Sequence, residues 1–190
     1  MTSESCLRCP WATGELLTAY HDQDWGVWRD EGDHHFELLT LEGAQAGLSW
    51  LTILKRRAEY RRLMLGFNPA RLASLGDEQV EAWMAEPSLI RNRAKLASVL
   101  ANARAFVQLE RECGSFPAFL AHGLGLQVQR NRWERPDQVP AQTPESERLS
   151  QELRRRGFRF VGPTVCYAYM QSVGLVNDHL MSCFRWAELG

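Results

Sequence analysis

The 190-residue chain contains no long hydrophobic run. No apolar stretch reaches the roughly 20 residues that a membrane-spanning helix needs. The first residues, MTSESCLRCPW, also lack the apolar core of a signal peptide. The sequence therefore predicts a cytoplasmic protein with no membrane association.

The chain lacks the signs of a disulfide framework and of extensive β-structure. Five cysteines, an odd number, argue against a disulfide framework in a reducing compartment. Runs that alternate polar and apolar residues are rare, and we find neither an internal repeat nor a low-complexity segment. A chain of this length buries a real core, so we expect one domain spanning residues 1–190.

Helix start and stop signals are present instead. Asn68 and Thr143 each precede a proline at an expected first helical position, and glycine follows each helical pattern. Only residues 123–142 read as a long loop. The fold class is therefore all-α. The predicted helices span 68–76, 88–113, 143–157 and 163–174. Apolar residues at helical spacing mark the core face of the second: Leu96, Val99, Leu100, Ala103, Phe106 and Val107.

The net charge of −1 does not by itself indicate a nucleic-acid-binding protein. Two arginine-rich clusters stand out, RRRGFR at 154–159 and RNRAK at 91–95. Each cluster alone is better explained as a solvated helix face. A local basic stripe on a nearly neutral protein would nevertheless suffice for phosphate contacts.

The segment VNDHLMSC, residues 176–183, predicts a short C-terminal helix with His179 and Cys183 on one face. Spacing alone slightly favours a buried cysteine beside a hydrogen-bonded histidine over a metal site. A structural zinc site would need further ligands from the other end of the chain. The candidates there are Cys6, Cys9 and His21. The remaining histidines are expected to be surface residues or residues capped by hydrogen bonds, not metal ligands: His34, His35 and His122.

Longer motifs run through almost the whole chain in one order, and together they resemble 3-methyladenine DNA glycosylase I. The resemblance implies a monomeric helix-hairpin-helix enzyme that cleaves N3-methyladenine from double-stranded DNA containing alkylated bases. It also implies one structural zinc ion that joins a small lobe made from both termini. The motifs are RCPW (8–11), AYHDQDWGV (19–27), LEGAQAGLSWLTILKRR (41–57) and RRGFRFVGPTVCYAYMQSVGLVNDH (155–179).

The resemblance selects the zinc ligands and the base-binding residues. It does not include Cys6, because the cysteine of the matching motif RCPW is Cys9. For Glu42 the residues alone favour a solvated glutamate at a helix end, but a carboxylate beside an aromatic face also suits a cationic base. The implied zinc ligands are Cys9, His21, His179 and Cys183. The implied base-binding residues are Tyr20, Glu42 and Trp50, with Trp11 and Trp25 as walls and Glu42 as the catalytic group.

The stretch GFRFVG between two predicted helices is the implied DNA-binding hairpin. Glycine there lets backbone approach a phosphate closely, and the following helix N-terminus offers free N–H groups. A plain turn between helices would have the same pattern, although the nearby arginines favour DNA. The residues assigned to DNA contact are Gly157, Arg159, Gly162 and Thr164.

Two departures from the wider superfamily bear on the reaction. Alignment on VNDH places Asn177 where most members carry a catalytic aspartate, with Asp178 next to it. Thr164 stands where bifunctional members carry a lysine, and the only lysines are Lys55 and Lys95. We therefore expect a monofunctional glycosylase. The alternative is a zinc-containing DNA-binding module that recognises damage without cleaving it.

Overall fold

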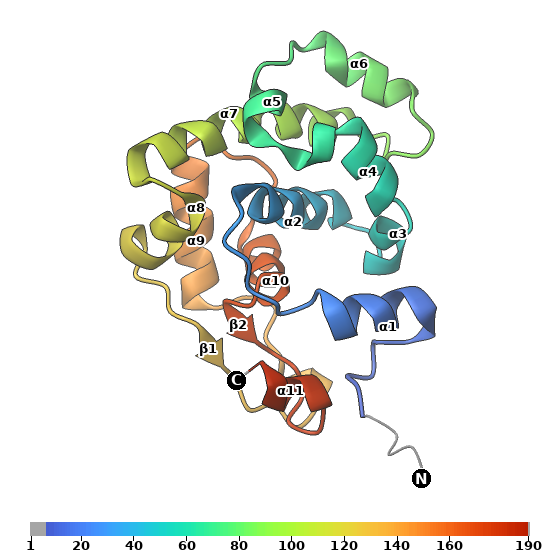
Figure 1. The fold of residues 1–190 in the computed structure, drawn as a ribbon, viewed down its shortest axis with the longest axis vertical. Coiled ribbons are helices and arrows are strands. Elements are labelled where there is room, and N and C mark those ends of the chain that lie inside the picture. Colours follow the sequence, from blue (N-terminus) through green and yellow to red (C-terminus); the bar gives the residue numbers. More distant parts are fainter. Residues whose placement is uncertain (1–6, 190) are drawn as a thin grey trace.

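The computed structural model describes residues 7–189, and this part of the chain is mostly helical, as predicted (Figure 1). Among these residues, no helix combines the length and apolar composition needed to cross a membrane. The α-helices are α1 (Gly14–Gln23), α2 (Gly32–Gln45), α3 (Trp50–Leu54), α4 (Arg57–Leu63), α5 (Pro69–Ala73), α6 (Glu78–Ala85), α7 (Arg93–Cys113), α8 (Phe116–Ala118), α9 (Pro144–Arg155), α10 (Pro163–Ser172) and α11 (Phe184–Glu188). Shorter helical turns span Leu65–Phe67, Phe119–Gly123 and Pro136–Gln138.

The helix boundaries follow local capping chemistry. The Asn68 side chain accepts a hydrogen bond from the Arg71 N–H at the start of α5, and Thr143 caps α9 in the same way. Helix α7 begins later than predicted, because Asn92 is its N-cap and accepts from the Lys95 N–H. The segment from residue 88 to the cap is therefore outside the helix.

Two very short strands were not predicted. Strand β1 (Gln129–Arg130) pairs in parallel with β2 (Val176–Asn177), so the long loop lies beside the C-terminal segment. The predicted helix over 176–183 is wrong. The chain leaves β2 through a turn closed by the Cys183 N–H donating to the Leu180 carbonyl, and α11 starts only after it.

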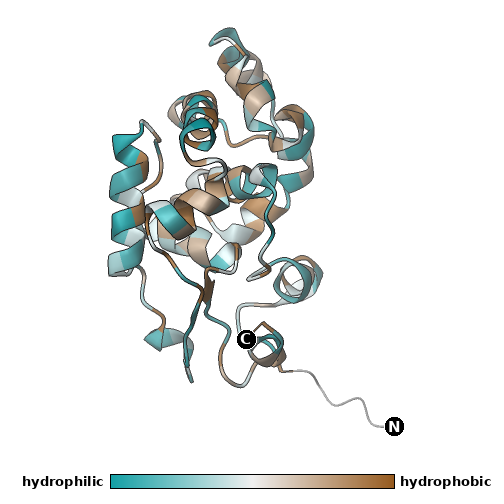
Figure 2. Ribbon diagram, turned by 60° about the vertical axis from the view of Figure 1, so that its left-hand side comes forward, coloured by the Kyte–Doolittle hydropathy of each residue, from teal (hydrophilic) through white to brown (hydrophobic). Residues whose placement is uncertain are grey.

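Helix α2 is central to the packing, and its residues from His34 to Ala44 are all buried. It contacts α7 and α10 in the main hydrophobic core, and Figure 2 shows hydrophobic colours in the helices at the centre. A second, smaller cluster joins the two ends of the described chain. Its members are Cys9, Leu180 and Cys183, with Trp11, Trp25, Trp133 and Phe184 packed against them.

Of the three unassigned histidines, only one lies at the surface, and none belongs to the Cys/His cluster described below. His34 and His35 are buried on α2, whereas His122 is exposed, as predicted. The Nε2–H of His35 donates to the Arg29 carbonyl at 2.8 Å, and its Nδ1 lies 2.7 Å from the Tyr169 hydroxyl. Burial lowers the pKa of His35 to about 4, so the ring is neutral and these two contacts satisfy it.

Candidate active site and metal centre

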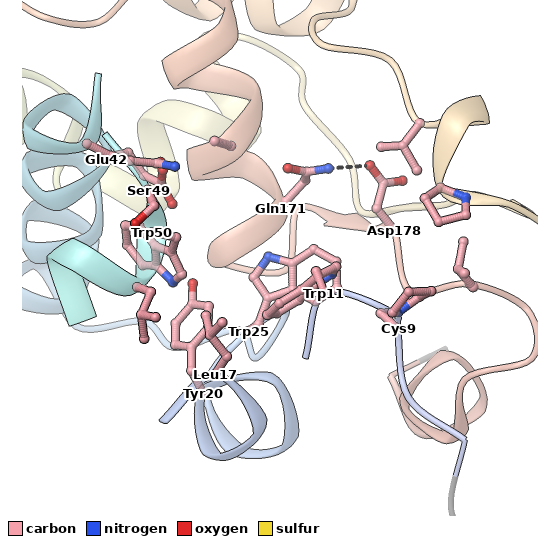
Figure 3. Close-up of a pocket in the computed structure, with 17 residues that line it drawn as sticks. Cys9, Trp11, Leu17, Tyr20, Trp25, Glu42, Ser49, Trp50, Gln171 and Asp178 are labelled. Carbon is pink, nitrogen blue, oxygen red and sulfur yellow. Dashed lines mark hydrogen bonds between the residues drawn. The ribbon is translucent and has the colours of Figure 1, made fainter. Parts of the chain in front are cut away.

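A cavity of about 450 Å³ lies between α1, the α2–α3 turn, α10 and the turn after β2 (Figure 3). All five residues predicted to bind the base line it: Trp11, Tyr20, Trp25, Glu42 and Trp50. The other lining residues are Cys9, Pro10, Leu17, Gln45, Ser49, Leu51, Pro136, Val139, Ala168, Gln171, Asp178 and Leu180. The volume falls within the range of small-molecule sites.

Three local structures bring the aromatic and acidic groups together. Tyr20 is in the last turn of α1, and Glu42 is in the C-terminal part of α2. Ser49 caps α3 by accepting from the Thr52 N–H at 3.2 Å, which fixes Trp50 at the first helical position. The ring centroids of Tyr20 and Trp50 are 5.3 Å apart as a result.

Glu42 is not the solvated glutamate that the residues alone favoured. Its side chain is only 5% exposed, and it has no hydrogen-bond partner among residues 7–189. Burial raises its pKa to about 8, because the charged form loses its hydration and gains no donor in exchange. The carboxyl group therefore lacks the partner that a ligand in the cavity would provide.

The cavity lining favours a positively charged occupant. It contains two carboxyl groups, those of Glu42 and Asp178, and four large aromatic rings, but no lysine, arginine or histidine. Aromatic faces and carboxylates both attract cations, most strongly where water is excluded.

The four predicted zinc ligands form one buried cluster, with one donor atom from each lying within 4.8 Å of the others. His21 Nε2 and His179 Nδ1 are 3.2 Å apart, and Cys183 Sγ lies 3.4 Å from the first and 3.5 Å from the second. Zinc bonds of 2.0–2.3 Å in a tetrahedron require donor separations of about 3.3–3.8 Å. The cluster fits zinc in donor type and size. Cys6 lies outside the described residues.

Neighbouring groups orient the two histidines. His21 Nδ1 lies 2.8 Å from the Asp22 carboxylate, and hydrogen bonds from Arg8 hold the pKa of Asp22 below its usual value. His179 Nε2 lies 3.4 Å from the Trp25 carbonyl. Such outer contacts fix which ring nitrogen faces a metal. With two thiols and two imidazoles, the set leaves no open position for a catalytic water.

The predicted DNA-contacting residues lie on a different surface, the hairpin between α9 and α10. Gly157 has a φ of +92°, and Asn102 holds the backbone of Arg159 through two hydrogen bonds of 2.8 and 3.0 Å. Gly162 is the N-cap of α10, and Thr164 in the first turn is exposed. None of the four assigned hairpin residues lines the cavity.

Ion pairing separates the hairpin arginines into two groups. Arg155 and Arg156 pair with Glu152, and Arg156 also pairs with Glu112. Within residues 7–189, Arg154 and Arg159 are exposed and have no ion-pair partner. Only part of the arginine run is therefore neutralised by the protein's own carboxylates, which leaves two cations for an external anion.

The side chains of Asn177 and Asp178 point to different parts of the molecule. The Asn177 amide turns away from the cavity and donates to the Trp186 and Leu189 carbonyls. Asp178, not Asn177, lines the cavity together with Gln171. Sequence reasoning missed both, because the side-chain direction of a residue next to a two-residue strand cannot be read from spacing.

Comparison with known proteins agrees with this geometry. The chain is 41% identical to DNA-3-methyladenine glycosylase 1 of Escherichia coli, over 93% of this chain and 95% of that protein. A crystal structure of 3-methyladenine DNA glycosylase I superposes with a TM-score of 0.89 at 42% identity, covering 94% of this chain and 98% of the other. A structure of the Staphylococcus aureus enzyme that shows the basis of 3-methyladenine recognition superposes with a TM-score of 0.88 at 29% identity. The match covers 93% of this chain and 95% of the other.

The fold is thus that of a DNA glycosylase. The chain belongs to the methyladenine glycosylase family, whose model matches residues 11–186.

Proposed function

We propose that the protein is a monofunctional DNA glycosylase that hydrolyses the N-glycosidic bond of N3-methyladenine in alkylated DNA. Family membership supports the excision of this base. The observation that carries the proposal in this chain is the buried carboxyl of Glu42, which has no partner among residues 7–189 and lies in an aromatic cavity without a basic residue.

The cavity would act on a nucleotide turned out of the duplex. N3-methyladenine carries a positive charge in DNA, so its entry favours the ionised form of Glu42. The base would stack on Trp50 and Tyr20, which offsets part of the cost of leaving the duplex. The indole N–H of Trp50 is buried with no partner in the described chain, and it would supply one further donor.

The reaction needs little covalent help from the protein. The bond between C1′ and N9 breaks, and its electron pair leaves with the base, which becomes neutral. Water adds to C1′ and releases its proton to solvent. Because the alkylated base is already a good leaving group, the protein's contribution is to bind, orient and stabilise charge.

The lysines support a monofunctional reaction. Lys95 Nζ donates to the carbonyls of Ala44 and Ala46 at 2.9 and 2.6 Å, and Lys55 is exposed. Neither lines the cavity. A Schiff base with the sugar, which strand cleavage requires, would need an amine at C1′.

The DNA would be held by the hairpin between α9 and α10 as a helix-hairpin-helix motif. Two arginines without an ion-pair partner among residues 7–189, Arg154 and Arg159, and the N-terminus of α10 support this role. We further propose that residues 1–190 form one domain and act as a monomer. A structural zinc ion held by Cys9, His21, His179 and Cys183 would join the N- and C-terminal segments.

The protein should release N3-methyladenine, leave N7-methylguanine largely in place and leave the abasic strand intact. Ionised Glu42 would accept hydrogen bonds from the exocyclic amine of adenine but would face the O6 acceptor of guanine. An unpaired acceptor of this kind costs on the order of 10²-fold in rate. Methylated duplex is incubated with the protein, released bases are separated by chromatography, and the strand is run on a denaturing gel before alkali.

Comparable release of the two bases would refute the discrimination by Glu42. Nicks that depend on the protein would refute the monofunctional reaction. No release of either base, with DNA binding retained, would leave the alternative of a damage-recognition module.

Replacing Gly162 with aspartate should weaken binding to damaged and undamaged duplex alike, by roughly tenfold or more. A carboxylate would meet a phosphate where backbone N–H groups should, and two like charges 4 Å apart cost about 1–4 kcal/mol depending on solvent access. A Cβ at this position lies 3.5 Å from Arg154 Nη2, an ordinary contact, so the fold should tolerate the change. Gly162→Ala is the uncharged control, and fluorescence anisotropy measures affinity. Unchanged binding by a folded Gly162→Asp would remove the hairpin as the DNA anchor.

A further inference from the structure

One of the chain's two lysines, Lys95, holds the end of a neighbouring helix. It lies in the first turn of α7, within the arginine-rich segment RNRAK. Its Nζ donates to the Ala44 carbonyl at 2.9 Å and to the Ala46 carbonyl at 2.6 Å, at the point where α2 ends. A cation there satisfies carbonyls that a helix leaves free at its C-terminus and complements the helix dipole. Lys95 therefore caps α2 from the side of α7.

The backbone that Lys95 holds leads directly into one edge of the base cavity. Residues 46–49 join α2 to α3 and are exposed. Ser49, the last of them, and Trp50 line the cavity on the same side as Glu42 (Figure 3). We call residues 46–50 the cavity rim. The position of the cavity rim depends on a contact with α7, the helix that lies next to α2 in Figure 1.

A second polar side chain on the same face of α7 holds the hairpin between α9 and α10. Asn102 follows Lys95 by seven residues, close to two helical turns, so it lies on the same side of the helix about 10 Å further along. Its side-chain amide donates to the Arg159 carbonyl at 3.0 Å and accepts from the Arg159 N–H at 2.8 Å. Both polar groups of one hairpin residue are therefore bound to α7.

The end of α2 and the hairpin meet between these two contacts. Gly43, Lys95, Asn102 and Phe160 are among the residues that line one small cavity at this junction. A Cβ at Gly43 would lie 3.2 Å from the Phe160 carbonyl oxygen and 3.3 Å from its Cβ, so α2 and the hairpin are already in close contact. The helix that ends at the cavity rim and the proposed DNA anchor thus pack against each other, and α7 binds both.

We infer that Lys95 and Asn102 are positioning residues, through which α7 sets the distance between the hairpin and the cavity rim. A damaged nucleotide turned out of the duplex is bound at both places at once, because neighbouring phosphates are held at the hairpin while the base enters the cavity. A displacement of about 1 Å between the two can cost on the order of 10²-fold in rate. The inference rests on the proposed role of the hairpin as the DNA anchor.

The test separates binding at each place from reaction of the joined substrate. Lys95→Met removes the ammonium group and keeps an unbranched side chain. The variant should bind free 3-methyladenine and undamaged duplex to within about twofold of the wild type, because the cavity and the hairpin each remain. Its release of N3-methyladenine from methylated duplex, measured in a single turnover with protein in saturating excess, should be at least about tenfold slower.

Lys55→Met is the matched control, because it removes the other lysine, which is exposed and lies outside this junction. It should release the base at the wild-type rate. Combining Lys95→Met with Asn102→Ala should slow release by less than the product of the two single losses, because both changes free the same distance. Lys95→Met alone tests the inference where Asn102→Ala fails to fold.

Four results would overturn the inference. They are an unchanged rate in folded Lys95→Met, a loss of duplex affinity that marks Lys95 as a phosphate contact, a loss of affinity for the free base that confines the effect to the cavity, and single losses that multiply in the double variant. Unchanged duplex binding by Gly162→Asp would instead overturn the role of the hairpin as the DNA anchor.

Discussion

Glu42→Gln is expected to stabilise the protein at alkaline pH while it weakens binding of the excised base. The folded protein holds the Glu42 proton with a pKa of about 8, above the ordinary value of 4.5. The stabilisation linked to this proton is therefore complete below about pH 4.5 and lost as pH rises through 8. Each pH unit between the two values contributes about 1.4 kcal/mol. Glutamine does not titrate. The free energy of unfolding of the variant should therefore rise relative to that of the wild type across this interval, by several kcal/mol at pH 9.

The measurement is the free energy of unfolding by urea at several pH values, with Glu134→Gln, a change at an exposed residue, as the control. Parallel curves for Glu42→Gln and the wild type would show that Glu42 is not buried without a donor. In the same preparations, Glu42→Gln should bind 3-methyladenine more weakly and undamaged duplex as well as the wild type. Equal affinities for the base would remove Glu42 from base recognition.

Cys183→Ala should lower metal content from one zinc per chain to well below one and destabilise the protein strongly. The cluster joins residues near both ends of the chain, and the binding free energy of a structural zinc is also folding free energy. Such sites contribute about 10 kcal/mol or more in small domains. That value equals or exceeds the whole stability of many proteins, so the N- and C-terminal segments should separate.

Cys113→Ala is the matched control, because Cys113 is half-buried and lies outside the cluster. Metal is measured by mass spectrometry and stability by thermal unfolding, with and without a chelator. A wild type without zinc, or Cys183→Ala with full occupancy and an unchanged melting temperature, would contradict the proposed site.

Local chemistry made much of the fold predictable. Asn68, Thr143 and the prolines that follow them define helix starts through backbone hydrogen bonds that depend only on neighbouring residues. The cap at Asn92 was missed because residues 88–91 contain no glycine or proline to mark a break before it. The strand pair was missed because it is short and joins segments far apart in the chain, so neither strand carries an alternating pattern of useful length.

Some residues of the candidate site were predicted from the sequence and others were not. The five residues predicted to bind the base and the four predicted to bind zinc were assigned through the resemblance to a family, and the structure brings each set together. The residues alone favoured a solvated Glu42, since burial depends on how α1, α3 and α10 surround the end of α2. Asp178 could not be assigned from sequence, because its four donors come from the long loop and α10 and converge only in three dimensions.

Three consecutive side chains at the end of β2 serve three different parts of the molecule. Asn177 donates to carbonyls in and just after α11, Asp178 joins the long loop to α10, and His179 lies against Cys9 and Cys183. A one-residue shift in an extended segment turns every side chain to the opposite face. Loss or gain of a single codon here would misdirect all three contacts at once, whereas a substitution disturbs one. We therefore expect this segment to tolerate substitutions better than insertions or deletions, in natural and engineered variants alike.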